Sequence, residues 1–318
     1  RRGGLRARRG ARRNHHLPAR EPERRGRQHP GADEHLHHAP GFDSLDFAGF
    51  DGFLHGFQLD APEGESFAHL HGLIEAAKRA YAIRDRVVTD FDHLAVDPQA
   101  FLTPERFKRE AAAIKMDRAA AWPFASADGD TIWMGAIDAS GLAISFIQSI
   151  YWEYGSGLVL PATGILWQNR GMAFSLNEKA LNPLQPGRRP FHTLNTPMAV
   201  FDDGRVMSYG AMGGDGQPQF QAQIFFRAMR YGQPLAKAID APRFLFGKTW
   251  GKPSATLKLE NRFDSRILEQ LDRAGHQIEI IDKPYADMFG HAGMLVLKPK
   301  GGIEAVHDPR SDGGALGI

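Results

Sequence analysis

The sequence contains no cysteine, and it has no uninterrupted apolar stretch long enough to cross a bilayer. The first absence excludes disulfide bonds, thiolate zinc sites and a cysteine nucleophile. The second predicts no membrane span. No segment combines a basic start with an apolar centre, so we expect no signal peptide. Cytoplasmic and periplasmic locations are both compatible with these features, and the localisation stays open.

Charge is nearly balanced over the 318 residues, at a net +2, but it is unevenly distributed. Residues 1–40 hold 11 arginines and 4 acidic residues, a net charge of +7, which leaves −5 for the rest. Segment 1–45 has almost no apolar periodicity and cannot bury enough apolar surface to fold. It is either a disordered basic arm or the product of a GC-rich gene read out of frame. A basic arm can bind nucleic acid, but this composition argues against it, and we predict no nucleic-acid partner.

Apolar residues make up 42% of the chain, enough for a core. Ser66 is the predicted N-cap of a first helix. The face expected to be buried holds Leu70, Leu73, Ile74, Ala77 and Tyr81, and the polar face holds Glu75, Lys78, Arg79 and Arg84. Thr103-Pro104 predicts a second helix that runs to about Met116. Asp117–Asp130 is a predicted exposed linker.

The remaining pattern predicts an α+β fold, because strands come first, helices next and strands again. Helices are therefore expected to cover an antiparallel sheet. Strands are predicted at 132–137, 142–150, 158–160, 198–201, 205–209, 277–281 and 294–297. Helices are predicted from the Gly213–Pro218 turn to Gly232 and from Ser265 to Ala274.

The stretch around Thr131 is a candidate site of chemistry. The polar run Ala127–Asp130 ends at this threonine, and an apolar strand pattern starts there. A threonine hydroxyl inside a chain needs a neighbouring base before it acts as a nucleophile. Cleavage of the Asp130–Thr131 bond would give Thr131 an α-amine that can take the proton of its own hydroxyl. The local pattern is also typical of an ordinary strand residue, so both interpretations stay open.

Two other stretches carry candidate site residues. Gly213-Gly214 precedes a predicted helix, where two backbone N–H groups can converge on one anion. The alternative for this pair is a tight turn that requires glycine. In Arg189-Pro190-Phe191-His192-Thr193 a polar pair follows a proline turn. It either lines a pocket or contains a satisfied structural histidine.

Taken in order, these stretches resemble the gamma-glutamyltransferase family of N-terminal nucleophile (Ntn) hydrolases. The resemblance covers about residues 60–318. The matching stretches are Gly129-Asp130-Thr131 with Asp138, Gly155-Ser156-Gly157, Thr163-Gly164, Gln168-Asn169-Arg170-Gly171, Pro186-Gly187-Arg188-Arg189-Pro190, Met212-Gly213-Gly214, Asp240-Ala241-Pro242-Arg243-Phe244, Gly275-His276 and Asp308-Pro309-Arg310-Ser311-Asp312-Gly313.

The resemblance implies an αββα sandwich and a precursor that cleaves itself into a large and a small subunit. Thr131 would become the first residue of the small subunit by attacking the Asp130 carbonyl. Its hydroxyl would then attack a γ-glutamyl amide, and the acyl group would pass to water, an amino acid or a peptide. Gly213 and Gly214 would hold the oxyanion, and Ser149 would hydrogen-bond the Thr131 amine. We expect no cofactor and no metal, since no His-x-x-x-His metal motif lies on a predicted helix.

The predicted substrate-binding residues depart from those of glutathione-cleaving relatives. Such relatives have asparagine where Tyr151 stands, glutamine or glutamate where Arg170 stands, and aspartate where Ala173 stands. A cationic Arg170 repels a substrate α-amine and favours a second carboxylate. His192 and Thr193 fall where the family has a serine pair for the substrate carboxylate. This pattern is similar to the divergent branch that includes cephalosporin- and glutaryl-type acylases.

The large subunit implied by the resemblance is far longer than the residues that match it here, so we expect a partial sandwich. Residues 46–130 are predicted to be the C-terminal part of the large subunit, and 131–318 the small catalytic subunit. The expected function is cleavage of a small γ-glutamyl or glutaryl-type amide by a heterodimer of these self-derived subunits. The alternative is an unprocessed, catalytically inert fragment.

Overall fold

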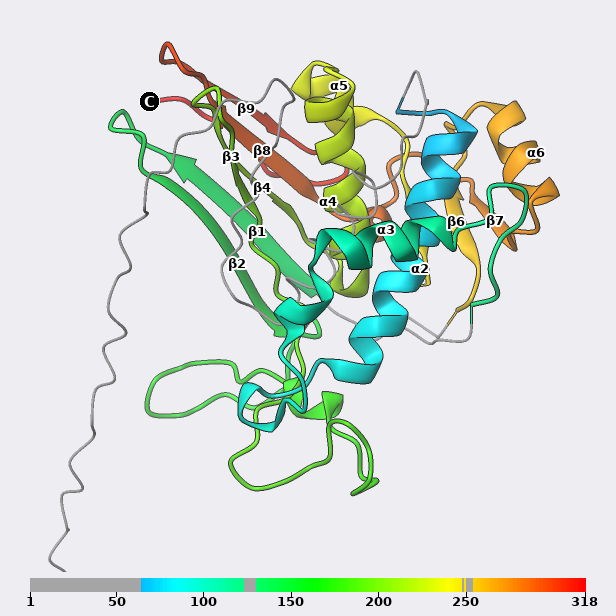
Figure 1. Ribbon diagram of the computed structural model, residues 1–318. Coiled ribbons are helices and arrows are strands. Elements are labelled where there is room, and N and C mark those ends of the chain that lie inside the picture. Colours follow the sequence, from blue (N-terminus) through cyan, green and yellow to red (C-terminus); the bar gives the residue numbers. More distant parts are fainter. Residues whose placement is uncertain (1–63, 123–129, 248, 250–253) are drawn as a thin grey trace, which may run out of the picture. The chain divides into compact units, whose positions relative to one another are not determined.

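The computed structural model describes residues 64–122, 130–247, 249 and 254–318, and Figure 1 shows how their helices and strands are arranged. The chain divides into two units, residues 1–33 and 34–318, and all described residues belong to the second. The predicted basic segment 1–45 and residues 123–129 of the predicted linker lie outside the described residues.

Helices and strands both occur along the described chain, as predicted for an α+β fold. The α-helices are α2 (Phe67–Val87), α3 (Pro104–Ala112), α4 (Gln217–Phe225), α5 (Leu235–Asp240) and α6 (Ser265–Arg273). The strands are β1 (Asp130–Ile137), β2 (Ala143–Tyr151), β3 (Met198–Val200), β4 (Val206–Ala211), β5 (Phe244–Phe246), β6 (Leu257–Glu260), β7 (Ile278–Ile281), β8 (Ala292–Leu297) and β9 (Ile303–His307). Short helical turns are η1 (Phe91–His93), η2 (Pro98–Phe101), η3 (Arg170–Ala173), η4 (Gly214–Gly216), η5 (Phe226–Arg230) and η6 (Asp287–Phe289). Among the described residues, none of the helices is long and apolar enough to cross a membrane.

The central element is a four-stranded antiparallel sheet in the order β3-β4-β8-β9. Helices α4 and α5 cover one face of this sheet, and the antiparallel hairpin β1–β2 lies against the other face (Figure 1). A three-stranded sheet, β5-β6-β7, packs beside α4, and α6 connects its parallel pair β6 and β7. The described residues therefore supply a hairpin layer, a sheet layer and a helix layer of the predicted sandwich.

Trp133 of β1 holds the hairpin against the four-stranded sheet. Its indole lies over Gly210 of β4 and Gly293 of β8, so closely that a β-carbon at Gly210 would approach a ring atom to 2.2 Å. The indole N–H donates to Ser145 Oγ of β2 at 2.9 Å. Ser208 Oγ of β4 donates to a carbonyl of β2 at 2.7 Å. The two glycines are therefore required because the indole occupies the space of their missing side chains.

Gly210→Ala is expected to lower the free energy of unfolding by about 1–3 kcal/mol, because the added methyl group displaces the Trp133 ring. Urea titration of the purified chain measures this change. Gly317→Ala is a control, since no atom lies within 4 Å of the carbon that it adds. We expect that control to change stability by less than about 0.5 kcal/mol. Equal stability of the two variants would show that Trp133 does not depend on the glycine at position 210.

The outer face of the hairpin is apolar and exposed among the described residues. Strand alternation turns Thr131, Trp133 and Ile137 toward the four-stranded sheet and the intervening residues away from it. The exposed apolar side chains are Ile132, Met134, Leu142, Ile144 and Phe146. This face is where a further layer of an αββα sandwich is expected to pack.

Helix α2 begins as predicted, with Ser66 Oγ accepting a backbone N–H at 3.3 Å. The predicted apolar face is buried, but the predicted polar face is wrong. Glu75, Lys78 and Arg84 are buried as well, and Arg79 is half-buried. The reason is that α3, α4 and α6 all pack against α2. Its charged side chains consequently pair inside the protein instead of facing water.

Two of the matching stretches meet in a buried charge network. Asp308 Oδ2 lies 2.6 Å from Arg243 Nη1, and Asp308 Oδ1 lies 3.0 Å from Arg310 Nη1. Arg310 also pairs with Glu260 of β6. Burial by itself raises the pKa of Asp308, but Arg243, Arg310 and two backbone N–H groups outweigh it and hold this pKa below its ordinary value. The network joins β6 to the residues after α5 and β9, which gives these stretches a structural role.

Two predictions about helices and strands are wrong, and a third differs only in helix type. The second helix ends at Ala112, short of the predicted Met116, and the chain turns there. Residues 158–160 form no strand, because Val159 makes only an isolated bridge. The helix predicted to end at Gly232 continues from α4 through the π-helical turn η5 to Arg230, and Gly232 follows with a φ of 62°, so its predicted end is confirmed. Elements α5, β5, β6 and β9 have no counterpart among the predicted ones, since each has at most six residues and is too short to show a clear period.

Candidate active site

Thr131 lies at the start of β1, opposite a β-bulge in β2. Its two neighbours pair with positions 151 and 148 of β2, so Ser149 and Ile150 both lie opposite Thr131. A bulge re-aims the side chains of the strand that carries the extra residue, which here is β2. The Thr131 side chain is half-buried on the side that faces the central sheet. Ser149, predicted to support the Thr131 amine, is thus brought beside it, and Ser149 Oγ accepts the N–H of Tyr151 at 2.9 Å.

A cavity of about 420 Å³ opens beside Thr131. One wall is the first part of β1, and another contains Met212, which directly precedes Gly213-Gly214. The candidate nucleophile therefore shares this cavity with Met212, the residue that precedes the candidate oxyanion turn. The polar side chains of the remaining wall come from His291, His307 and Ser311.

The Gly213-Gly214 turn has the backbone geometry that only glycine adopts easily. The φ angles are 132° at Gly213 and 52° at Gly214. A β-carbon at Gly213 would also approach the Phe220 ring to 2.7 Å. The tight-turn interpretation is therefore correct. The anion-binding interpretation is compatible with it, because η4 starts at Gly214 and α4 follows, so that the positive end of the helix dipole is directed toward the turn.

Two side chains of helix α2 hold the residue that follows the Gly213-Gly214 turn. Arg84 Nη1 donates to Asp215 Oδ1 at 3.0 Å, and both side chains are buried. The Tyr81 hydroxyl donates to the backbone carbonyl of Asp215. The sequence pattern placed Arg84 on a solvent-facing side, so this positioning role was not predicted.

Three of the predicted substrate-binding residues gather where β2 ends. The Arg170 guanidinium lies 4.8 Å from the centre of the Tyr151 ring, and Tyr151 is the partner of Asp130 in the hairpin. Burial, and next the charge of Arg170, lower the pKa of His192 to about 4, so this imidazole is neutral at neutral pH. Thr193 follows it in the chain, is buried, and has a hydroxyl without a hydrogen-bond partner among the described residues.

Gln217 is a buried polar residue that is not among the predicted site residues. It is the first residue of α4 and directly follows η4. Neither its side-chain oxygen nor its nitrogen has a hydrogen-bond partner among the described residues. A buried polar group left without a partner costs about 1–3 kcal/mol, which makes this amide a candidate contact for a bound molecule. Its place directly after the glycine turn was the signal that the sequence offered.

His307 and Ser311 form a second polar feature that was not predicted. Ser311 Oγ and His307 Nε2 lie 3.0 Å apart, and both residues line the cavity beside Thr131. A β-carbon at Gly313 would approach the His307 ring to 2.4 Å, so the chain closes tightly over this pair. The pair therefore supplies hydrogen-bonding groups to the wall of the cavity.

Comparison with known protein families agrees with the family resemblance predicted from the sequence. The family model described as Gamma-glutamyltranspeptidase matches residues 52–318. The chain belongs to the gamma-glutamyltranspeptidase family. The predicted resemblance is thereby confirmed, and the matched region contains every described element of the fold.

Two curated relatives and one solved structure show how far the similarity extends. The chain is 50% identical over 260 residues to the oxamate amidohydrolase proenzyme of Klebsiella pneumoniae, covering 82% of this chain and 49% of that protein. It is 37% identical over 265 residues to the glutathione hydrolase-like YwrD proenzyme of Bacillus subtilis, covering 83% and 50%. The structure of the cephalosporin acylase from Bacillus halodurans superposes with a TM-score of 0.72 at 29% identity, covering 84% and 48%. The predicted α+β fold of the Ntn-hydrolase type is confirmed, and the chain spans about half the length of these relatives.

Proposed function

We propose that this chain forms the catalytic part of an amidohydrolase whose nucleophile is Thr131, freed by cleavage of the Asp130–Thr131 bond. The observation that carries this proposal is the shared cavity of Thr131 and Met212, the residue before the Gly213-Gly214 turn. Membership of the gamma-glutamyltranspeptidase family supports the reaction class. The names of the two curated relatives, both proenzymes, support processing of a precursor.

Self-cleavage starts with attack of the Thr131 hydroxyl on the backbone carbonyl of Asp130. The peptide C–N bond breaks, an ester forms, and the released nitrogen becomes the α-amine of Thr131. Water then hydrolyses the ester and restores the hydroxyl. Residues 46–130 thereby belong to a large subunit and 131–318 form the small subunit of a heterodimer. Ser149, opposite Thr131 in the bulge, is placed to hydrogen-bond the new amine.

In turnover, the α-amine of Thr131 takes the proton of the hydroxyl as the oxygen attacks a substrate amide. The N–H groups of Gly213 and Gly214 hold the oxyanion, and loss of one such donor costs about 3–4 kcal/mol. Collapse of the intermediate breaks the C–N bond, and the leaving amine takes the proton. Water, or the amine of an amino acid or peptide, then removes the acyl group. The alternative to this proposed function is a chain that is not cleaved between Asp130 and Thr131 and has no catalytic activity.

We infer that the substrate is a small amide with a carboxylate close to the reacting carbonyl, such as oxamate or, second, a glutaryl-type amide. Arg170 carries a permanent positive charge and lies against Tyr151, beside the proposed cleavage site. A γ-glutamyl substrate would bring an α-ammonium to this charge, and the chain has Ala173 where an aspartate would be needed to hold it. The 50% identity to an oxamate amidohydrolase proenzyme supports oxamate as the first candidate.

Ammonia release from oxamate by the full chain tests this proposal. Oxamide, which has the same amide but no carboxylate, is the matched substrate, and we expect oxamate to react faster. A γ-glutamyl amide is expected to react slowly. Mass spectrometry of the same sample is expected to show two fragments that meet at Asp130/Thr131. An intact chain without ammonia release supports the inert alternative, whereas cleavage with a preference for the γ-glutamyl amide would overturn the assigned substrate.

A further inference from the structure

The turn Gly213–Gly216 contains only one residue with a side chain, Asp215. Glycine has more conformational freedom than any other residue, so a turn of this composition keeps one geometry only where contacts fix it. Within the turn, the N–H of Gly216 donates to the carbonyl of Gly213 at 2.8 Å. Backbone N–H donors stabilise an oxyanion best when they are held in place before it forms. The contacts of Asp215 therefore bear directly on the proposed oxyanion site.

Helix α2 supplies two contacts to Asp215. The Tyr81 hydroxyl donates to the backbone carbonyl of Asp215, and Arg84 Nη1 donates to Asp215 Oδ1 at 3.0 Å. The Arg84 guanidinium is fixed at a second point, because its Nε donates to Asp85 Oδ1 at 2.8 Å. Helix α2 precedes Thr131 in the chain and the turn follows it. After the proposed cleavage, these contacts would join the large subunit to the small one.

Arg84 also contacts the stretch that contains the predicted substrate-binding pair. Its guanidinium carbon lies 4.6 Å from the centre of the Tyr81 ring and 5.4 Å from that of Phe191. A cation at such a distance from an aromatic ring is attracted to it. Phe191 directly precedes His192 and Thr193. Arg84 therefore lies between the oxyanion turn and the substrate-binding stretch.

The charge of Arg84 matters as much as its hydrogen bond. The carboxylate of Asp215 belongs to the residue after Gly214, and the side chains of Asp215 and Arg84 are only 5% and 8% exposed. Charges inside a protein are weakly screened, so an unpaired carboxylate here would oppose the negative charge that develops on the substrate oxygen. The guanidinium of Arg84 offsets that carboxylate.

We propose that Arg84 and Tyr81 are positioning residues for the oxyanion turn, an inference that rests on the function proposed above. They act on the turn through Asp215 and do not touch the reacting atoms. The oxyanion exists only in the transition state and the intermediate, so a poorly held turn lowers kcat and leaves KM nearly unchanged. Helix α2 thereby completes a site whose nucleophile and N–H donors both lie in the proposed small subunit.

Three variants of the full chain test this role. Tyr81→Phe removes only the hydroxyl and keeps the ring. Arg84→Met removes the guanidinium and keeps most of the stem. Arg84→Met with Asp215→Asn also removes the carboxylate charge that the single substitution leaves unpaired. The readouts are kcat and KM per cleaved chain, counted by mass spectrometry, and the thermal midpoint. The substrate is oxamate, or the γ-glutamyl amide if the wild type prefers it.

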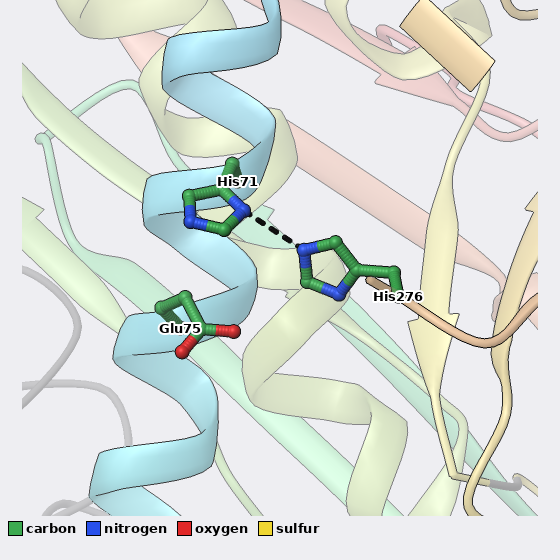
Figure 2. Close-up of side chains that lie close together, drawn as sticks. All are labelled: His71, Glu75 and His276. Carbon is green, nitrogen blue, oxygen red and sulfur yellow. Dashed lines mark hydrogen bonds between the residues drawn. The ribbon is translucent and has the colours of Figure 1, made fainter. Parts of the chain in front are cut away.

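A matched control comes from another buried polar contact of the same helix (Figure 2). His71 Nδ1 of α2 and His276 Nε2 are hydrogen-bonded at 2.8 Å, and His71 Nε2 donates to the carbonyl of Lys115 at 2.9 Å. Both histidines are buried, and neither is among the residues that line the cavity beside Thr131. His71→Leu leaves His276 without this partner, so we expect a lower thermal midpoint and a wild-type kcat.

We expect kcat to fall about tenfold in Tyr81→Phe, with KM within about twofold of the wild type, and about 100-fold in Arg84→Met. The added Asp215→Asn is expected to restore about tenfold of that loss, because no unpaired carboxylate remains beside the turn.

A wild-type kcat in Tyr81→Phe and Arg84→Met would overturn the inference. A loss of kcat in His71→Leu as large as theirs would also overturn it, because it indicates general damage to α2. A change in KM alone would assign α2 to substrate binding instead of the turn. If Arg84→Met stays uncleaved, the kcat of Tyr81→Phe decides the question. A wild-type chain that neither cleaves itself nor hydrolyses an amide refutes the proposed function, and the positioning role with it.

Discussion

Thr131→Ala is expected to abolish both self-cleavage and amide hydrolysis. The alanine side chain has no hydroxyl, so no ester can form at Asp130 and no acyl-enzyme can form with a substrate. Loss of a nucleophile lowers turnover by a factor on the order of 10⁶ in enzymes that act through a covalent intermediate. Intact-mass measurement is expected to show one uncleaved chain, and ammonia release from oxamate is expected to fall to background.

Two control variants test whether the loss in Thr131→Ala comes from the missing hydroxyl. Thr131→Ser keeps a hydroxyl at the bulge and is expected to cleave itself, at a reduced rate. Thr163→Ala removes a threonine from an exposed loop and is expected to behave as the wild type. Continued cleavage in Thr131→Ala would assign the nucleophile to another residue. Ser311 is then the first to examine, because it lines the same cavity and lies 3.0 Å from His307 Nε2.

The local elements that sequence predicts well are those whose pattern is decided by neighbours in the chain. Ser66 caps α2 because its hydroxyl accepts a backbone N–H one turn away. The hairpin β1–β2 was predicted because two apolar strand patterns flank a four-residue turn that ends at Gly141. Such features depend on residues a few positions apart, and they can be derived without knowledge of the remaining fold.

The features that sequence does not predict depend on partners far along the chain. Glu75 and Lys78 are typical of a solvent-facing helix surface, yet they are buried because their partners include Ala120 and the elements packed on α2. Arg84 pairs with Asp215, more than a hundred residues away. Nothing in the periodicity of α2 distinguishes a charged side chain that faces water from one that pairs inside the protein.

The residues of the candidate site likewise divide into those that the sequence predicts and those that it does not. The glycine pair and the threonine at the strand start were found because each has a local chemical signature, and the family resemblance joined them. Gln217, His307 and Ser311 were not found, because their relevance follows only from where the fold puts them. A histidine at the end of a strand and a serine in a tail have no signature that separates them from surface residues, and Gln217 is marked only by its place directly after the glycine turn.

Arg170→Gln is expected to lower kcat/KM for oxamate on the order of 100-fold, because the variant no longer supplies a positive charge for the substrate carboxylate. The same substitution is expected to change kcat/KM for oxamide little, since oxamide has no carboxylate. Ala173→Asp in the Arg170→Gln background is expected to raise activity on a γ-glutamyl amide, because it adds an anionic partner for the α-ammonium. Ammonia release from the three substrates measures all of these changes.

A second readout of Arg170→Gln is independent of activity. In the wild type, burial and then the charge of Arg170 lower the pKa of His192 to about 4. Removal of that charge is expected to raise this pKa toward the ordinary value, which NMR titration of the imidazole detects. Arg205→Gln is the matched control, because Arg205 also stacks on an aromatic ring, 4.4 Å from the centre of Phe201, but away from the site. An equal loss for oxamate and oxamide in Arg170→Gln would mean that Arg170 supports the end of β2 through Tyr151 and does not select the carboxylate.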